Sequence, residues 1–434
     1  GASFGMKVAV VDENKLGGVC INRGCIPTKA LLHASNIFSM MQHGDEFGVS
    51  TDFISFDFAK MQDYKKRSVR RYRDEIQKLF DKNNITFIKG KATIRREKTI
   101  EVVGESGKEY LRAKNIIIAT GAKPIMPNIP GINLPGVINS DRLLAVPTWN
   151  YDRIVIMGGG VIGVEFATIF QALCSKVTIV EKGPHLLGPM DEEVSEALKE
   201  QLVKKGITVY CNAMVEEIQR EEGLVCTVRH LLTDETTQIK TNQVVVAVGR
   251  APYTEGLLGE DMSLQIEHGR PVVNADFETS EPGIYAIGDV SAKTQLAHVA
   301  MAQATYVIEN LAGKPHTIRL EAVPNGMFVS LPIVPSCIYT EPEIATVGLT
   351  EAKAGELGMK VRCGVYDMGE NGKSIIAREE HGFIRLIFEA YSNTIVGAQM
   401  MCPRATDMIG EMATAIANGL TAEQLSLAMR AHPT

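Results

Sequence analysis

The stretch Arg153-Ile-Val-Ile-Met-Gly158-Gly-Gly-Val-Ile-Gly163 decides the fold. Its apolar run at 154–157 predicts a buried strand, and the glycines fit the pattern G-x-G-x-x-G at the start of a helix that reaches about residue 173. A second apolar strand, at 176–181, follows and ends in an acid. Because the motif lies between a strand and a helix, it predicts a dinucleotide-binding α/β unit rather than a chance match.

Each glycine of this turn has a mechanical role. Gly158 permits a tight turn, Gly160 lets the backbone approach a pyrophosphate, and Gly163 packs the helix on the strand. The amides at the helix start then face the phosphates. Glu181 can accept both hydroxyls of a ribose and would repel a 2′-phosphate, which favours NAD over NADP.

An earlier part of the chain repeats this design. The strand at 7–12 ends at Asp12, like the second strand of such a unit, so most of a preceding strand, glycine turn and helix is missing. The segment Asn115-Ile-Ile-Ile-Ala-Thr-Gly121 is echoed by Gln243-Val-Val-Val-Ala-Val-Gly249-Arg250. The sequence therefore predicts two similar nucleotide-binding halves, of which the first lacks its start.

The remaining elements complete four segments. We expect helices at 28–41, 58–83 and 296–311, short strands within 85–103, a strand at 279–289 that ends at an exposed Asp289, and a loop at 317–334. Beyond 335, strands at 382–389 and 394–401 alternate with helices at 351–357 and 406–418. The predicted domains are 1–150, 151–273, a segment at 274–334 that returns to the first domain, and 335–434. The second helix is expected to present a solvated basic face, formed by Lys65, Lys66, Arg67, Arg70, Arg71 and Arg73.

Composition narrows the class of protein. The 434 residues are 45% hydrophobic and 22% charged, with a formal net charge of −6, which is typical of a globular protein and gives no attraction to nucleic acid or anionic lipid. No apolar run approaches the roughly 18 to 20 residues of a membrane span. No signal peptide is visible, eight cysteines are too few for a secreted scaffold, and none has zinc spacing, so we expect a cytoplasmic protein without a metal. Six of the cysteines are expected to be small buried hydrophobes, namely Cys174, Cys211, Cys226, Cys337, Cys363 and Cys402.

Two cysteines stand apart from the others. Cys20 and Cys25 lie in the segment Leu16-Gly-Gly-Val-Cys20-Ile-Asn-Arg-Gly-Cys25-Ile-Pro-Thr-Lys29. A disulfide is reachable if the backbone makes one irregular turn, which Gly24 allows. Arg23 and Lys29 would favour a thiolate at a helix start. On spacing alone, two unpaired structural thiols remain the alternative.

The segment at 17–29 closely resembles the redox-active segment of the pyridine nucleotide-disulphide oxidoreductases, which are flavoproteins with two dinucleotide-binding domains. The resemblance implies an α/β fold with two Rossmann-like dinucleotide-binding domains and a C-terminal α+β dimerisation domain. It extends in order along nearly the whole chain, through Asp12, Ala119-Thr120-Gly121, Gly158 to Glu181, Gly249-Arg250, Gly288-Asp289 and His432-Pro433.

The resemblance also implies roles for single residues. Cys20 would be the interchange thiol that meets a dithiol substrate, and Cys25 the thiol on the flavin side. Lys29 would lie beside the flavin, paired with Glu165. His432 would be the general base and would reach Cys20 from the other subunit of a homodimer. The implied FAD-binding residues are Asp12, Gly18, Lys29, Thr120, Gly121, Gly288, Asp289, Ala297 and His298, and the NAD-binding residues are Gly158, Gly160, Gly163, Glu181, Gly249 and Arg250.

Within the family, the dihydrolipoamide dehydrogenase branch is resembled most. The features in common are the ending Ile-Pro-Thr-Lys29, the acid at Glu181 and the run Tyr339-Thr340-Glu341-Pro342-Glu343. This branch oxidises protein-bound dihydrolipoamide with NAD. The implied partners are the lipoyl domains and core subunit of a 2-oxoacid dehydrogenase or glycine-cleavage complex, in the cytoplasm or the mitochondrial matrix.

Three other kinds of protein remain as alternatives. A glutathione-type reductase would carry basic residues at the position of Glu181, a mercuric reductase would need an added C-terminal cysteine pair, and a non-catalytic dimeric paralogue would keep only the fold.

The sequence departs from the family pattern in three places. The first glycine-rich loop for FAD is absent, the chain stops at Thr434 before the acid expected to orient His432, and Val19 replaces the usual threonine. We therefore expect further segments at both ends.

Overall fold

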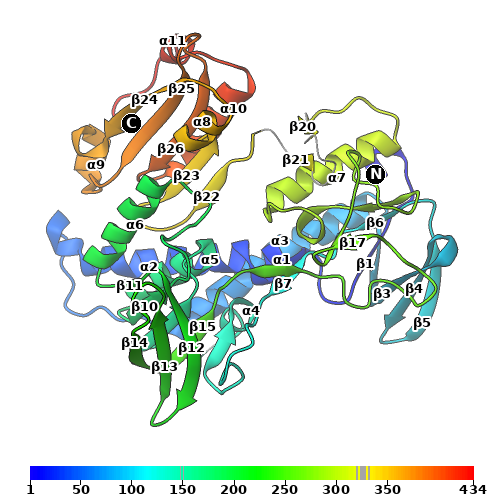
Figure 1. Cartoon of the computed structure of the whole chain (residues 1–434), viewed down its shortest axis with the longest axis horizontal. Coiled ribbons are helices and arrows are strands. Elements are labelled where there is room, and N and C mark those ends of the chain that lie inside the picture. Colours follow the sequence, from blue (N-terminus) through cyan, green and yellow to red (C-terminus); the bar gives the residue numbers. More distant parts are fainter. Residues whose placement is uncertain (147, 150, 319–320, 323–328, 331–332) are drawn as a thin grey trace.

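The computed structural model describes residues 1–434 except 147, 150, 319–320, 323–328 and 331–332. Three α/β parts are visible in Figure 1: the N-terminal part with α7 (Ala297–Leu311) on the right, the sheet that carries β10 (Lys176–Val180) and β15 (Gln243–Val246) below, and a C-terminal part at the upper left. The mixed α/β architecture predicted from the sequence is confirmed.

The central sheet follows from the apolar strand that precedes Gly158. It is parallel throughout, with the order β11-β10-β9-β15-β8. Ile154 and Ile156 pack in the cluster that contains helix α5, while Val155 and Met157 pack against the three-stranded meander on the other face. Both faces of β9 are therefore buried, which is why its sequence is continuously apolar. The bounds are β8 Val137–Asn139, β9 Arg153–Met157, α5 Val161–Ala172, β10 Lys176–Val180, α6 Glu192–Lys204, β11 Thr208–Tyr210, β12 Ala213–Arg220, β13 Leu224–His230, β14 Thr236–Thr241 and β15 Gln243–Val246.

The N-terminal part is joined by a later segment of the chain. Strand β1 pairs with β2 in parallel, and β6 pairs in parallel with β19, which comes from beyond the central sheet. Strand β7 pairs with β16, directly after the central sheet. The bounds are β1 Ala9–Asp12, α1 Gly18–Arg23, α2 Cys25–Gln42, α3 Phe58–Lys82, β2 Thr86–Lys89, β3 Lys91–Arg95, β4 Thr99–Gly104, β5 Gly107–Arg112, β6 Ile116–Ile118, β7 Ala122–Pro124, α4 Ser140–Leu143, β16 Arg250–Pro252, β17 Ile266–Glu267, β18 Arg270–Pro271, β19 Ile284–Ala286, η4 Gly288–Val290 and α7 Ala297–Leu311.

The C-terminal part is an antiparallel sheet with helices. Its order is β22-β23-β26-β25-β24. Ile338, Ile344 and Met401 belong to the same core cluster as Leu198 and Leu202 of α6, so this part packs directly on the central one. The bounds are β22 Ser336–Ile338, β23 Ile344–Gly348, α8 Glu351–Glu356, β24 Val361–Asp367, α9 Gly372–Ala377, β25 Phe383–Glu389, β26 Ile395–Met401, α10 Ala405–Ala417 and α11 Ala422–Ser426.

Most predicted elements are present, with differences at their ends. Helix α3 matches the helix predicted at 58–83, whereas α2 begins at Cys25, before the predicted start. Strand β8 already belongs to the central sheet, although the predicted boundary lies later, at residue 150. In the predicted loop at 317–334, the described residues include two short strands, β20 Glu321–Ala322 and β21 Val329–Ser330, and the rest lies partly outside the described residues.

Three expectations about exposure were wrong. Lys65 is 5% exposed, because its amine donates to Gln62 Oε1 and to the Leu144 carbonyl oxygen instead of meeting water. Burial lowers the pKa of Lys65 to about 8, with a further contribution from Lys66. Asp289 is half-buried rather than exposed. Among the six single cysteines, Cys226 and Cys402 are buried as expected, two are half-buried, and Cys174 and Cys363 are exposed.

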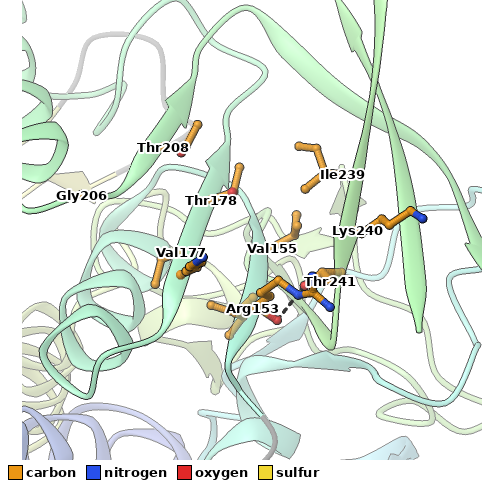
Figure 2. A pocket seen from close by; sticks show the side chains of 11 residues that line it. Arg153, Val155, Val177, Thr178, Gly206, Thr208, Ile239, Lys240 and Thr241 are labelled. Carbon is orange, nitrogen blue, oxygen red and sulfur yellow. Dashed lines mark hydrogen bonds between the residues drawn. The ribbon is translucent and has the colours of Figure 1, made fainter. Parts of the chain in front are cut away.

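The central sheet has an open cavity at the end opposite the glycine turn. Figure 2 shows this cavity of about 390 Å³, which includes Arg153 and Val155 at the start of β9 and Ile239 of β14 in its lining. Gly158 and Gly163 are absent from the lining. The cavity is therefore separate from the predicted dinucleotide site.

Candidate active site

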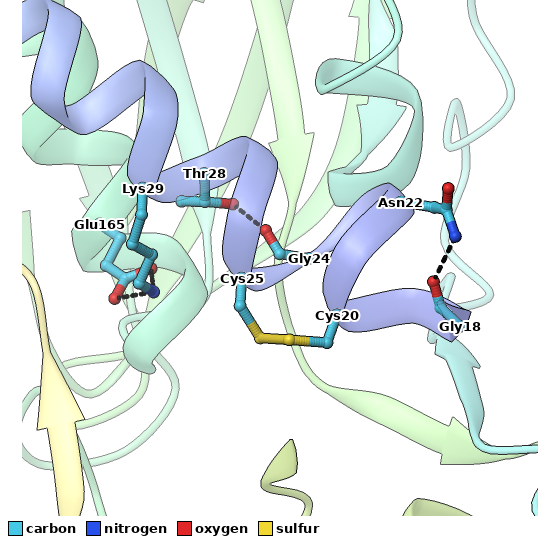
Figure 3. Close-up of a disulfide and its surroundings, with 8 residues drawn as sticks. All are labelled: Gly18, Cys20, Asn22, Gly24, Cys25, Thr28, Lys29 and Glu165. Carbon is cyan, nitrogen blue, oxygen red and sulfur yellow. Dashed lines mark hydrogen bonds and ion pairs between the residues drawn. A yellow bond between two sulfur atoms is a disulfide. The ribbon is translucent and has the colours of Figure 1, made fainter. Parts of the chain in front are cut away.

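The two predicted redox cysteines are joined at the junction of two helices. Cys20 lies in α1, Cys25 is the first residue of α2, and a disulfide connects them across a Cα–Cα distance of 4.7 Å (Figure 3). At Gly24, a Cβ would lie 3.1 Å from the Val19 carbonyl oxygen and 3.2 Å from Cys20 Cα. A side chain here would press on backbone atoms, so glycine suits this irregular turn. The disulfide between Cys20 and Cys25 confirms the prediction, and the alternative of two unpaired thiols is wrong.

Side-chain hydrogen bonds hold this segment in shape. Asn22 Nδ2 donates to the carbonyl oxygens of Leu16 at 2.9 Å and Gly18 at 3.0 Å, and Thr28 Oγ1 donates to the Gly24 carbonyl oxygen at 2.7 Å. The sequence analysis missed Asn22. Its position between the two cysteines was the available signal, because asparagine side chains commonly bond to nearby backbone groups in turns.

An ion pair between a half-buried lysine and a buried carboxylate connects the redox helix to the central domain. Lys29 Nζ lies 2.7 Å and 2.8 Å from the two carboxylate oxygens of Glu165 in α5, and Glu165 is only 3% exposed. The Tyr339 amide donates to Glu165 Oε1 at 3.2 Å, and Lys29 Nζ lies 4.5 Å from the centre of the Tyr339 ring. The pairing of Lys29 with Glu165 is thus present, and Tyr339 adds the C-terminal part to it. The position of Lys29 beside a flavin stays a prediction.

The residues expected to hold FAD lie at the carboxyl ends of parallel strands. Asp12 ends β1, and Thr120 and Gly121 follow β6. Thr120 Oγ1 donates to the Tyr253 carbonyl oxygen at 2.6 Å. Gly121 has φ +73°, and a Cβ there would meet nothing within 4 Å. This edge of the sheet therefore leaves backbone open to a ligand, as nucleotide-binding α/β folds require.

Asp289 supplies a second test of whether FAD fits. Burial raises the pKa of its carboxyl group, against the opposing charges of Arg250 and Arg270. Among the residues that the structure describes, its carboxylate has no hydrogen-bond partner. The preceding Gly288 has φ +70°, and its amide donates to Gln303 Oε1 at 2.7 Å. A half-buried carboxylate without a protein partner fits a ligand with hydroxyl groups, as FAD has in its ribityl chain.

Three further residues expected to bind FAD lie at the starts of helices α7 and α1. Ala297 and His298 are the first two residues of α7, and His298 is exposed. Gly18 has φ +59° at the start of α1, and a Cβ there would meet nothing within 4 Å. The contacts of these three residues with FAD stay predictions.

The three glycines of the dinucleotide turn differ in how much space a side chain would have. Gly158 has φ +106°, and a Cβ there would lie 2.4 Å from the Ala247 carbonyl oxygen. A Cβ at Gly163 would lie 2.0 Å from the Gly158 carbonyl oxygen, whereas at Gly160 it would meet nothing within 4 Å. The first and third glycines are thus required by the protein itself, and the second leaves space at the helix start where phosphates bind.

These differences predict opposite outcomes for two alanine variants. Gly163→Ala is expected to destabilise the protein by about 1–3 kcal/mol, because its methyl group overlaps the backbone. Gly160→Ala is expected to leave Tm nearly unchanged and to raise KM for NAD, because its methyl group fills only the space of the pyrophosphate. Thermal unfolding and steady-state kinetics on both variants check this pair. Equal losses of Tm would contradict it.

Glu181 lies beside this turn at the end of β10. Its carboxylate accepts hydrogen bonds from the amides of Gly159 at 2.5 Å and Gly183 at 2.6 Å. The backbone therefore fixes the carboxylate next to the helix start, where a ribose would follow the phosphates.

Gly249 and Arg250, which are also expected to bind NAD, follow strand β15. Gly249 has φ +125°, and the Arg250 guanidinium pairs with Asp141 at 3.3 Å and donates to the Ala122 carbonyl oxygen at 2.6 Å. Arg250 is therefore placed at the crossing between the two nucleotide-binding parts. Contacts of Gly249 and Arg250 with NAD stay a prediction.

A single chain does not bring His432 to the disulfide. His432 is exposed near the end of the chain, and it forms no hydrogen bond or ion pair with the described residues. The nearby Thr434 carbonyl oxygen accepts from Asn371 Nδ2 of the same C-terminal part at 3.0 Å. The role of His432 as a base requires a partner subunit and stays a prediction.

Within the described ranges, no group of three or more histidine, cysteine, aspartate or glutamate side chains could hold a metal ion. No helix in the described part of the chain is both long and apolar enough to cross a membrane.

Comparisons with known proteins agree with the geometry. Residues 1–304 match the family profile described as pyridine nucleotide-disulphide oxidoreductase, and residues 334–434 match the dimerisation domain of that family. The chain is 34% identical to a dihydrolipoyl dehydrogenase of Geobacillus stearothermophilus and 36% identical to one of Chlorobaculum parvum, over 100% of this chain and 89% and 90% of those proteins. Its structure is similar to the HOCl-induced flavoprotein disulfide reductase RclA of Escherichia coli, with a TM-score of 0.84 and 27% identity over 100% of this chain and 93% of that one.

These matches confirm the resemblance seen in the redox segment, and they cover the nucleotide-binding parts as well as the C-terminal sheet. The family binds FAD and NAD(P). The chain belongs to the pyridine nucleotide-disulphide oxidoreductases, with a redox-active disulfide between Cys20 and Cys25 and a C-terminal dimerisation domain.

Proposed function

We propose that this protein oxidises protein-bound dihydrolipoamide to lipoamide and reduces NAD. The observation that carries the proposal is the Cys20–Cys25 disulfide at the junction of α1 and α2. Such a pair can exchange with a dithiol, and full-length relatives with 34% and 36% identity are named dihydrolipoyl dehydrogenase. The acid at Glu181 supports NAD as the acceptor.

The chemistry begins with thiol–disulfide exchange. One thiolate of dihydrolipoamide attacks the Cys20 sulfur, the Cys20–Cys25 bond breaks, and Cys25 leaves as a thiolate. The second substrate thiol then attacks the mixed disulfide at the substrate sulfur, which releases lipoamide and leaves Cys20 reduced. His432 of the partner subunit takes the proton of the attacking thiol and so acts as the general base. Two electrons and two protons thus pass from the substrate to the protein.

Bound FAD would supply the redox chemistry that connects the two cysteines to NAD, which takes up the electron pair as hydride. Asp12, Gly121 and Asp289 would hold FAD, because they combine open backbone with a carboxylate that lacks a protein partner. Lys29 would lie on the flavin side of the disulfide, since it follows Cys25 by one helical turn. Glu165 and Tyr339 keep its ammonium group in place.

Glu181 makes the choice of pyridine nucleotide testable. Wild-type protein is expected to prefer NAD to NADP in kcat/KM, because the carboxylate would repel a 2′-phosphate. Glu181→Gln is expected to reduce that preference by roughly tenfold or more, the loss of one charge-assisted hydrogen-bonding group. Steady-state kinetics with both nucleotides check this result. An unchanged ratio would show that Glu181 does not face the ribose.

The active unit we propose is a homodimer in the cytoplasm. The match to a dimerisation domain supports it, and His432 is available to a second subunit because it is exposed. The partners would be the lipoyl domains and core subunit of a 2-oxoacid dehydrogenase or glycine-cleavage complex.

Turnover with defined substrate pairs tests the proposal. The holoenzyme should reduce NAD with dihydrolipoamide, and it should show little activity with NADPH plus glutathione disulfide or NADPH plus Hg²⁺. Activity only with one of the NADPH pairs would identify a sister enzyme. Inactivity with every pair would favour a non-catalytic paralogue, against which the intact Cys20–Cys25 and Lys29–Glu165 pairs argue.

A further inference from the structure

Three charged side chains link the redox segment to the crossing between the nucleotide-binding parts. Arg23 Nη1 lies 3.6 Å from Asp141 Oδ2, and Arg250 Nη1 lies 3.3 Å from Asp141 Oδ1. Arg23 is the last residue of α1, Asp141 lies in α4, and Arg250 begins β16. One carboxylate therefore pairs with two cations that are far apart in the sequence.

Arg23 is placed to act on Cys20. The two residues are three positions apart in α1, and side chains at this spacing are neighbours on one helix face, with Cβ atoms about 5–6 Å apart. A guanidinium group beside a thiol stabilises the thiolate, which is the nucleophile in disulfide exchange and the group that leaves. The spacing in α1 therefore puts the Arg23 side chain within reach of Cys20 when it is not held by Asp141.

Asp141 is the fixed member of this arrangement. The side chains of Asp141 and Arg250 are 18% and 11% exposed, whereas that of Arg23 is 45% exposed. Arg250 is also anchored through its bond to the Ala122 carbonyl oxygen at 2.6 Å. The carboxylate thus has a defined place, and the exposed guanidinium of Arg23 is held against it.

We propose that Asp141 is a positioning residue that limits the reactivity of the Cys20 thiolate by holding Arg23 in this ion pair. Breaking the pair would leave the Arg23 charge free to stabilise the thiolate on the same helix face. The inference rests on the proposed function only where it treats Cys20 as the interchange thiol. Asp141 would then influence the reactivity of this thiol from a position in α4, outside the redox segment.

The other charged groups near this segment have partners of their own or act elsewhere. Lys29 of α2 pairs with Glu165 of α5, and Lys65 of α3 donates to Gln62 and to the Leu144 carbonyl oxygen. Arg250 also acts on Asp289 of η4: its positive charge lowers the pKa of the Asp289 carboxyl group, whereas burial raises that pKa by more. In the described part of the chain, Asp141 is the carboxylate that pairs with Arg23.

Alkylation of Cys20 measures this effect directly. The holoenzyme is reduced anaerobically with dithiothreitol and treated with iodoacetamide at pH 7, and mass spectrometry gives the rate at each cysteine. Asp141→Asn should raise the Cys20 rate roughly two- to fivefold, the range of an exposed ion pair. Arg23→Gln should lower it, and the double variant should match Arg23→Gln alone. The exposed Cys174 serves as an internal reference.

A matched control uses the same chemical change at an aspartate outside this arrangement. Asp152 is exposed and forms no ion pair with the described residues, so Asp152→Asn should leave the Cys20 rate unchanged. If Asp141→Asn does not fold, two other variants remain. Asp141→Glu keeps the carboxylate and should have the wild-type Cys20 rate, and Arg23→Gln still tests the charge of the guanidinium group.

Two outcomes would overturn the proposal. In the first, Asp141→Asn leaves the Cys20 rate unchanged. In the second, it raises the rate equally in the presence and absence of Arg23, so that the carboxylate acts without the arginine. Because the assay contains neither dihydrolipoamide nor NAD, a failure here is distinct from a failure of the proposed function.

Discussion

Replacement of Cys20 by serine is expected to lower the rate of NAD reduction by dihydrolipoamide by roughly 10³-fold or more, the scale of losing a catalytic nucleophile. Cys20 lies in α1 at the junction with α2, and its sulfur is bonded to Cys25. A serine there leaves Cys25 without a disulfide partner, so no exchange with a dithiol can begin. Steady-state assays with dihydrolipoamide and NAD measure the loss.

Two controls separate the chemistry from folding. Cys174 is exposed and belongs to none of the proposed sites, so Cys174→Ser should retain wild-type activity. Electron transfer from NADH to ferricyanide needs no dithiol, so Cys20→Ser should retain it. If Cys20→Ser still oxidised dihydrolipoamide at a rate within tenfold of wild type, the assignment of the disulfide to catalysis would be wrong.

Replacement of Lys29 by methionine is the second change with a large expected effect. It leaves the Glu165 carboxylate, which is 3% exposed, without its main counter-charge at 2.7 Å. Removing one partner of a buried ion pair costs about 3–5 kcal/mol, because the remaining charge is buried and uncompensated. The remaining contact, from the Tyr339 amide at 3.2 Å, cannot replace an ammonium group. Equilibrium unfolding in urea measures this loss of stability.

A double variant gives the decisive control for this pair. In Lys29→Met with Glu165→Gln, no buried charge remains, so much of the lost stability should return. The activity should stay low, because Lys29 would still be missing beside the flavin. If the double variant were as unstable as the sum of the two single variants, the two side chains would act independently.

Some features of the fold could be predicted from the sequence because a single residue type marks them, and others could not. The turn at Gly158 and the disulfide beside Gly24 were predictable, because at each of them glycine marks a close backbone approach. Burial of Lys65 was not predictable, since its partners are a glutamine on the same helix and a carbonyl oxygen at Leu144. A basic helix pattern does not show which lysine finds such acceptors.

Some residues of the candidate site could also be predicted and others could not. The cysteines, the glycines and the acids at the carboxyl ends of strands were predictable from their order along the chain. The contacts that join distant elements could not be predicted from the sequence, and they include Tyr339 with Lys29, and Asp141 with both Arg23 and Arg250. Tertiary packing sets these contacts, because sequence spacing within one helix or strand says nothing about a partner more than a hundred residues away.

Anaerobic titration of the holoenzyme with dihydrolipoamide, followed by NAD, tests the central claim most directly. The flavin spectrum should change on addition of dihydrolipoamide, with a new long-wavelength absorbance from the Cys25 thiolate beside the flavin, and NAD should restore the original spectrum. No spectral change with dihydrolipoamide, together with reduction by NADPH, would contradict the proposed substrate and the proposed acceptor.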